Sequence, residues 1–221
     1  YRAALKGLTP ERAMETVFSG NPWTTSFTED SFGNIWIGTY RNGTFCFHKN
    51  QTPFQKSMSG KNIECMSTDH SGNYWIGSLN GEVCVLDSTQ KQIMGKTIFP
   101  NDMIHTICGQ ESSNKVWVGT MYGLYEAWIE SNKQIVYQKT SGINIPSIRS
   151  IVQDSCFLWI ASYNNGVTLY NYSTQQSVVT YKTDSEVLPL PSNTIRTILK
   201  DRENNLWVGT AEGLVVLNGK E

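Results

Sequence analysis

The chain has 221 residues, of which 39% are hydrophobic and only 17% are charged, a composition that suits a globular protein with a substantial core. Its 18 lysines and arginines balance 19 aspartates and glutamates, which excludes the charge excess expected of a nucleic-acid-binding surface. No apolar run approaches the roughly 20 residues that a membrane-spanning helix requires. We therefore expect no nucleic-acid partner and no direct membrane insertion for this region.

Residues 1–20 differ from the rest of the chain. No signal-peptide pattern follows Tyr1, so we expect an excised or processed piece of a longer protein. Tyr1–Leu5 is predicted to form a strand, and Thr9 followed by Pro10 predicts the start of a short helix. Residues 19–22, with the sequence SGNP, are predicted to end that helix.

One motif recurs five times along the remaining chain. The copy at residues 30–43 reads DSFGNIWIGTYRNG, and the copy at residues 201–213 reads DRENNLWVGTAEG. Successive tryptophans of the motif are 39, 42, 42 and 48 residues apart, at Trp36, Trp75, Trp117, Trp159 and Trp207. Self-similarity at such a period predicts a solenoid, a propeller or another repeat array.

Each repeat predicts three short strands separated by turns rich in Gly, Asn and Asp, which favour tight hairpins. The first strands, apolar at both ends and therefore expected to pack on both faces, are Thr24–Phe27, Ile63–Met66, Ile104–Ile107, Ile148–Ile151 and Ile195–Ile198. The second strands, which carry the tryptophans, are Ile35–Thr39, Tyr74–Ser78, Val116–Thr120, Leu158–Ser162 and Leu206–Thr210. The third strands are Thr44–Phe47, Glu82–Leu86, Leu124–Trp128, Val167–Tyr170 and Leu214–Leu217.

A fourth, more polar strand is predicted in four of the repeats, at Pro53–Lys56, Gln92–Ile98, Gln134–Gln138 and Val178–Lys182. Its polarity is typical of an outer edge strand. Four antiparallel strands per repeat predict an all-β fold, a β-propeller with blades at about residues 21–60, 61–100, 101–143, 144–191 and 192–221. The repeated tryptophans are interpreted as packing anchors between blades, because five equivalent catalytic tryptophans would have no chemical purpose.

The five cysteines lie at scattered strand positions, without a C-x-x-C pair. We expect them to act as small buried hydrophobic residues, and we expect no metal site and no cofactor.

The pattern D-x-x-G-N-x-W-[IV]-G-T-x-x-G, preceded by I-x-x-I, resembles the two-component regulator propeller repeat over about residues 21–217. Gln110 replaces the Asp in the third copy, and Ala161 replaces the strand Gly in the fourth. The resemblance implies the periplasmic sensor region of a hybrid two-component system of Bacteroidetes, which senses glycans or their fragments and signals to a histidine kinase elsewhere in the chain. Family members commonly carry seven blades, so five repeats are compatible with a closed five-blade ring or with part of a larger one.

Two groups of residues are candidates for ligand binding. The residue five positions before each turn-opening Asp or Gln is polar in every repeat, and a ring of polar groups near the channel mouth is predicted at Thr25, Glu64, His105, Arg149 and Arg196. The alternative is that these groups bind channel water and neighbouring blades. The turn after the second strand adds aromatic and polar side chains suited to sugars, at Tyr40, Arg41, Tyr122, Tyr163 and Asn164. Trp23 and the loop at residues 184–191 are expected on the same face.

Catalysis has little support, because no H-E-x-x-H, G-x-S-x-G or phosphate-binding glycine loop occurs. The preferred hypothesis is a non-catalytic sensor that binds an oligosaccharide. The alternatives are a protein-interaction or homodimerisation propeller without a small ligand and, least favoured, a propeller glycosidase or lyase, for which Glu64 is the only obviously placed acid. Expected partners also include other blades or domains of the same chain.

Overall fold

The computed structural model describes residues 24–29, 33–40, 43–47, 55–57, 61–87 and 92–217. The expectations for residues 1–20, for Trp23 and for Arg41 lie outside this part. The chain divides into two compact units, Tyr1–Ile63 and Glu64–Glu221. The described residues form strands, turns and loops, and none of them belongs to a helix able to cross a membrane.

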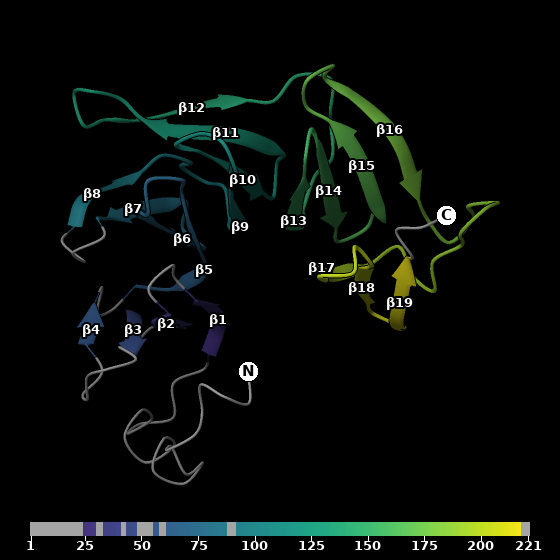
Figure 1. Cartoon of the computed structure of the whole chain (residues 1–221), viewed down its shortest axis with the longest axis horizontal. Helices are drawn as coiled ribbons and strands as arrows, with labels where there is room; N and C mark the ends of the chain where they lie inside the picture. Colours follow the sequence, from purple (N-terminus) through teal and green to yellow (C-terminus); the bar gives the residue numbers. More distant parts are fainter. Residues whose placement is uncertain are drawn as a thin grey trace, which may run out of the picture. The chain divides into compact units, whose positions relative to one another are not determined.

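The strands form five antiparallel sheets, each built from strands that follow one another in the sequence (Figure 1). The first sheet contains β1 (Thr24–Glu29), β2 (Ile35–Thr39), β3 (Gly43–Phe47) and β4 (Gln55–Ser57). The second contains β5 (Ile63–Thr68), β6 (Tyr74–Ser78), β7 (Glu82–Leu86) and β8 (Gln92–Thr97). The third contains β9 (Ile104–Gly109), β10 (Lys115–Thr120), β11 (Leu124–Ile129) and β12 (Ile135–Lys139).

The fourth sheet contains β13 (Ile148–Asp154), β14 (Phe157–Ser162), β15 (Val167–Asn171) and β16 (Gln176–Tyr181). The fifth contains β17 (Ile195–Lys200), β18 (Leu206–Thr210) and β19 (Gly213–Leu217), with three strands in the described residues. The predicted all-β class and blade-like sheets are confirmed. Within residues 64–221 the inner strand β13 contacts both β9 and β17, while β12 and β16 lie on the outside (Figure 1).

The turn-opening aspartate organises the hairpin between the first two strands. Asp69 Oδ1 accepts a hydrogen bond from the backbone N of Asn73 (3.0 Å), and Asp69 Oδ2 accepts from Asn73 Nδ2 (2.9 Å) and Trp75 Nε1 (2.9 Å). Asp201 accepts the equivalent bonds from Asn205 and from Trp207 Nε1 (2.8 Å). Gly72 supplies the positive φ of 79° that the turn needs. The motif therefore links turn geometry to the orientation of the indole.

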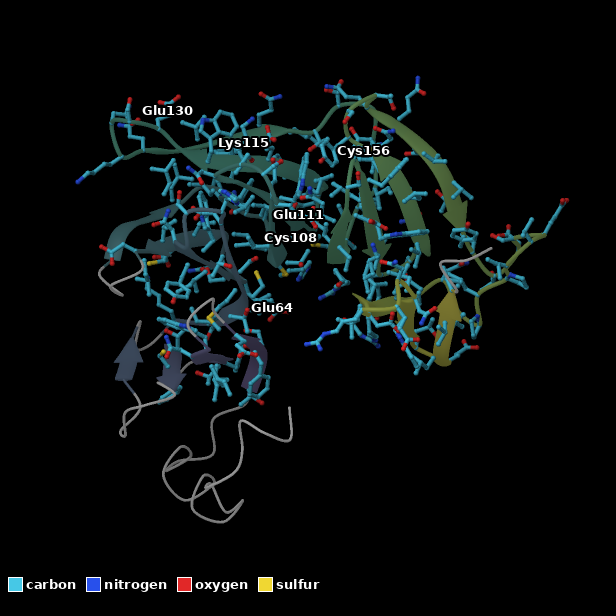
Figure 2. The ribbon with its side chains drawn as sticks, viewed as in Figure 1. Glu64, Cys108, Glu111, Lys115, Glu130 and Cys156 are labelled. Carbon is cyan, nitrogen blue, oxygen red and sulfur yellow. The ribbon has the colours of Figure 1, made fainter. Side chains whose placement is uncertain are left out.

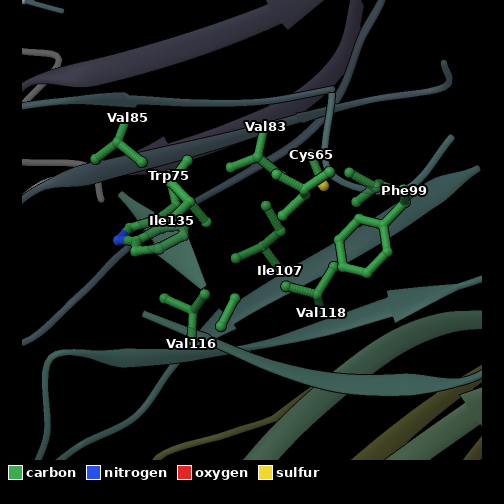
Figure 3. Packing of buried hydrophobic residues seen from close by; sticks show 12 residues of the cluster. Cys65, Trp75, Val83, Val85, Phe99, Ile107, Val116, Val118 and Ile135 are labelled. Carbon is green, nitrogen blue, oxygen red and sulfur yellow. The ribbon is translucent and has the colours of Figure 1, made fainter. Parts of the chain in front are cut away.

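The tryptophans lie where one sheet packs on the next, as predicted. Trp75 is completely buried in a cluster with Cys65 and Val83 of its own sheet and with Ile107 and Val116 of the following sheet (Figure 3). Trp117 packs in the same way against the fourth sheet, and Trp159 packs partly against the fifth. Trp207, in the last sheet, is 37% exposed. The interpretation as anchors between blades is confirmed for Trp75, Trp117 and Trp159.

The glycine of the W-[IV]-G segment permits close packing between sheets in the second and third repeats. A Cβ atom at Gly77 would lie 2.7 Å from Ile104 Cγ2 and 3.1 Å from Ile107 Cδ1. A Cβ atom at Gly119 would similarly lie 2.5 Å from Ile148 Cγ2. Both apolar ends of the inner strand β9 thus face the same neighbour. The expectation that they pack on opposite faces is wrong.

The reason is a β-bulge in the inner strand. Gly119 and Thr120 are adjacent on β10, but they pair with Thr106 and Ile104, so His105 is an extra residue without a partner. The same shift occurs between β13 and β14 and between β17 and β18, at Arg149 and Arg196. In a regular strand, residues three apart point to opposite faces of the sheet. The extra residue of the bulge brings them to the same face.

None of the five cysteines, all of which lie in the described ranges, forms a disulfide bond. Cys46, Cys65 and Cys84 are buried, and Cys108 and Cys156 are half-buried. Burial raises the pKa of the Cys108 thiol to about 11, so this thiol stays protonated at neutral pH. The prediction of small buried hydrophobic residues is confirmed for Cys46, Cys65 and Cys84, whereas Cys108 and Cys156 are only half-buried.

Candidate functional site

The polar residues predicted to line the channel mouth occupy equivalent places on the inner strands. Glu64, His105, Arg149 and Arg196 are the second residues of β5, β9, β13 and β17, each after a fully buried isoleucine (Figure 2 labels Glu64). For the last three, this second residue is the bulged one. Because a bulged residue leaves the hydrogen-bond ladder, its side chain is re-aimed. Thr25 occupies the same kind of bulge in β1, within the other unit.

Two of these residues meet at the aromatic ring of Tyr163, in the turn after β14, and a third contacts one of them. The guanidinium carbons of Arg149 and Arg196 each lie 5.2 Å from the centroid of the Tyr163 ring, a distance at which cation–π attraction operates. Arg149 Nη1 lies 3.2 Å from Nδ1 of His105. We call His105, Arg149, Tyr163 and Arg196, together with Glu64, the mouth cluster.

His105 is neutral within the cluster. Burial lowers the pKa of its imidazole to about 4, and the positive charge of Arg149 acts in the same direction, while Asp102 opposes both. A guanidinium group can only donate, so Nδ1 of His105 must accept the bond from Arg149. The imidazole proton therefore resides on Nε2, which makes His105 a donor on its other side.

Glu64 contributes the carboxylate of the cluster. Burial raises the pKa of its carboxyl group, and the charge of Arg149 lowers it in part. The charge of Asp102 raises the pKa of His105 in part. The Asp102 side chain is buried, and its Oδ1 accepts hydrogen bonds from the backbone N of Met103 (2.7 Å) and of Met121 (3.0 Å). Asp102 therefore has a structural role, and no motif or spacing in the sequence indicates it.

Hydrogen-bond donors exceed acceptors in the mouth cluster. Arg149 Nε is buried and has no hydrogen-bond partner in the described part of the chain. Neither arginine forms an ion pair there, where the ion pairs are Lys115–Glu126 and Lys200–Asp154. The Arg196 side chain is exposed. The cluster thus presents cationic donors that the described residues satisfy only in part.

Backbone hydrogen bonds join the loops at this end of the sheets. The N–H of Met121 donates to the carbonyl of Met103 (3.0 Å), that of Ser147 to Met121 (2.8 Å), and that of Tyr163 to Ser147 (2.9 Å). Each bond connects a loop that precedes an inner strand to a turn that follows a second strand. Tyr163, the residue that both arginines contact, is therefore held by a continuous main-chain network.

The other predicted site residues are less closely connected. Asn164 is exposed and its Oδ1 accepts from Thr194 Oγ1 at 3.4 Å, which ties the turn to the next sheet. Tyr122 is 57% exposed in the turn after β10, and its carbonyl accepts from Lys139 Nζ at 3.2 Å. Tyr40 is half-buried in the first unit. Leu190 anchors the loop at residues 184–191 in the core between the fourth and fifth sheets.

A cavity of about 590 Å³ lies elsewhere in the described part of the chain. Asp154, Trp159, Lys200 and Leu206 are among its lining residues, which places it beside the Asp201 turn, at the opposite end of the strands from Tyr163. None of the candidate site residues lines it. We therefore place the candidate site at the mouth cluster, where cationic and aromatic groups from consecutive sheets converge.

The groups of the mouth cluster are suited to recognition of a ligand. Hydrolysis of a glycoside commonly requires two carboxyl groups placed on either side of one bond, whereas Glu64 supplies the carboxyl group of the cluster and interacts electrostatically with Arg149. No group of three or more His, Cys, Asp and Glu side chains suitable for a metal ion occurs in the described ranges.

Four-stranded antiparallel blades, packed face to face in chain order around their first strands, define a β-propeller. The model of the family described as "two component regulator propeller" matches residues 18–41 and 189–212, which include most of the first and last copies of the motif. Among curated proteins no significant match was found.

Solved structures share the fold. The extracellular domain of a putative hybrid two-component system from B. thetaiotaomicron matches with a TM-score of 0.72 and 24% identity over 91% of this chain and 27% of its own. PorZ, a surface component of the type-IX secretion system of Porphyromonas gingivalis, matches with a TM-score of 0.69 and 16% identity over 91% of this chain and 34% of its own. An auxiliary nutrient binding protein from Bacteroides thetaiotaomicron matches with a TM-score of 0.68 and 14% identity over 90% of this chain and 60% of its own. This chain therefore spans about a quarter to a third of the length of the first two.

Proposed function

We propose that this chain is part of the periplasmic sensor of a hybrid two-component system. In this proposal it binds an oligosaccharide without chemical conversion and signals to a histidine kinase elsewhere in the protein. The observation that carries the proposal is the convergence of equivalent bulged residues on Tyr163. Evenly repeated, re-aimed polar side chains on a rigid scaffold suit ligand binding better than packing. The repeat family and the likeness to an extracellular sensor domain support the class of protein.

A screen of oligosaccharides by calorimetry, with variants at the loop end of the sheets, tests the proposal. We expect Tyr163→Ala to weaken binding at least tenfold, because Tyr163 positions both arginines. Tyr122→Ala should weaken it less, through loss of an exposed stacking surface. Tyr137→Ala, on the outer strand β12, is the matched control. Unchanged affinity in the Tyr163 variant would contradict the proposed site, and failure of every saccharide to bind would contradict the proposed ligand class.

A second function, an interaction or dimerisation propeller without a small ligand, is favoured by one observation. The face of the last sheet that carries Trp207 also exposes Leu199, Leu214 and Val216. An exposed apolar face of this kind is typical of an association surface. Association that depends on this face, in a protein that binds no saccharide, would support this alternative.

A further inference from the structure

The mouth cluster has the chemistry of a binding site for a negatively charged group. Its two arginines approach one aromatic ring from adjacent inner strands, although like charges repel each other and need a reason to converge. Such an arrangement is stable in the absence of ligand because the ring attracts both cations. It leaves their outer N–H groups available.

The donors are only partly satisfied by the protein. Arg149 uses Nη1 on His105, while its Nε is buried without a partner. Arg196 makes no hydrogen bond or ion pair in the described part of the chain, and His105 directs its Nε2 proton away from Arg149. Two carboxylates oppose the positive charge of the cluster. Glu64 interacts electrostatically with Arg149, and Oδ1 of Asp102 accepts hydrogen bonds from the backbone amides of Met103 and Met121.

We infer that the mouth cluster is a subsite for a carboxylate or sulfate group carried by an acidic saccharide. Guanidinium groups bind such planar or tetrahedral anions in a bidentate manner, more strongly than they bind neutral hydroxyl groups. Arg196 is the first contact, because it is exposed, and Arg149 completes the subsite with the help of His105. This inference rests on the proposed function, since it specifies the class of saccharide that the same site binds.

The test compares charged and neutral probes of equal size on the whole chain. Calorimetric titrations with glucuronate, with glucose 6-sulfate and with glucose should give at least tenfold tighter binding of one or both anions, and this preference should weaken as the salt concentration rises. The two charged probes distinguish a carboxylate from a sulfate subsite. Equal affinity for glucose and both anions, or no binding of either anion, would overturn the inference.

A charge-matched pair of variants locates the effect. Arg196→Gln should lower anion affinity at least tenfold and affinity for a neutral saccharide by a clearly smaller factor, because glutamine keeps a hydrogen-bonding side chain but removes the charge, and an exposed arginine can be replaced without unfolding the sheet. Arg202→Gln removes the same charge from the exposed turn at the other end of β17 and β18 and should change neither affinity. Equal losses in both variants would show a general charge effect and overturn the inference.

The two proposals fail in different ways. If a neutral oligosaccharide binds in a manner that requires Tyr163, and acidic probes bind no better, the sensor function stands and the anion subsite is wrong. If acidic monosaccharides bind through Arg196 but no oligosaccharide binds more tightly, the anion subsite stands and the proposed glycan ligand is wrong.

Discussion

Trp75 and Trp117 occupy the same position in consecutive repeats, but their indole N–H groups differ in hydrogen bonding. The N–H of Trp75 donates to Asp69 at 2.9 Å. The third repeat has Gln110 instead of the Asp, and Gln110 binds Glu126 through Nε2 at 2.8 Å. Trp117 Nε1 is consequently buried without a hydrogen-bond partner among the described residues. A single change in the motif thus leaves an unsatisfied polar group between two sheets.

This difference predicts unequal effects of the same substitution. Trp75→Phe should lower the free energy of unfolding by about 1–3 kcal/mol more than Trp117→Phe, because only the former breaks a buried hydrogen bond to a carboxylate. The loss of indole volume is common to both variants and cancels in the comparison. Urea unfolding of the two variants measures the difference, and a larger loss in Trp117→Phe would show that hydrogen bonding is not the cause.

Titration of His105 makes the free energy of unfolding depend on pH. An unfolded histidine has a pKa near 6.5, whereas burial and the charge of Arg149 lower the pKa of His105 to about 4. Between these values the unfolded state binds more protons than the folded state, so the free energy of unfolding falls as the pH is lowered from about 6.5 to about 4. The contribution of His105 is fully present above this window.

We expect His105→Gln to reduce this fall in stability, since glutamine does not titrate and its side-chain oxygen can accept from Arg149. Thermal unfolding at a series of pH values, with His70→Gln in an exposed turn as the control, measures the effect. The raised pKa of Glu64 acts in the opposite direction, so the difference between the wild type and the variant is the informative quantity. Identical pH profiles would contradict the assignment.

The inner strand is the element that most determines the site. Its bulge turns two isoleucines toward the preceding sheet and simultaneously frees one residue from the ladder. The same two isoleucines pack closely against Gly77 of that sheet. The packing of sheets and the placement of site residues therefore depend on the same local irregularity.

The close contact predicts that added volume is costly. Gly119→Ala should destabilise the chain by about 1–3 kcal/mol, because its Cβ would collide with Ile148 and Thr106. Gly209→Ala is the matched control: its Cβ would meet only Thr197 of its own sheet, at 3.1 Å, and the loss should be smaller. Chemical unfolding compares the two, and equal losses would mean that packing between sheets is not responsible. Ala161, which occupies this position in the fourth sheet, shows that a repacked interface accepts a Cβ there.

The strands could be predicted from the sequence because five aligned copies of one motif fix their positions. The second strands Ile35–Thr39, Tyr74–Ser78 and Leu206–Thr210 were predicted at the residues observed. The bulge was missed, because apolar residues three apart are equally compatible with a strand packed on both faces. The equivalent polar positions were identified by alignment, but the contact of both arginines with Tyr163 depends on a turn conformation that spacing does not specify.

In the second to fifth sheets, one of the two faces carries the tryptophan of the motif. The face that carries the tryptophan packs on the following sheet in the second, third and fourth sheets. In the fifth sheet Leu199, Trp207 and Val216 lie opposite one another on this face and remain partly or largely exposed. Exposed apolar area of this kind favours association.

We expect the chain to associate as its concentration rises, and Leu199→Lys with Leu214→Lys to reduce this association, because both leucines are more than 60% exposed on that face. Sedimentation velocity over a range of concentrations measures the effect. Val187→Lys is the control, because Val187 is also apolar and is 85% exposed, but lies in the loop at residues 184–191. A wild-type chain that sediments as a monomer at every concentration would contradict the expectation.

The bulged position has a consequence for how such chains diversify. A residue without a ladder partner can change in charge and size while the frame of the sheet is retained, and threonine, histidine and arginine already occupy the bulged position in different repeats. Duplication and exchange of whole repeats would carry one such residue with each copy. New specificities can then arise by recombination and by single codon changes, while the strand and turn residues that determine the fold are retained.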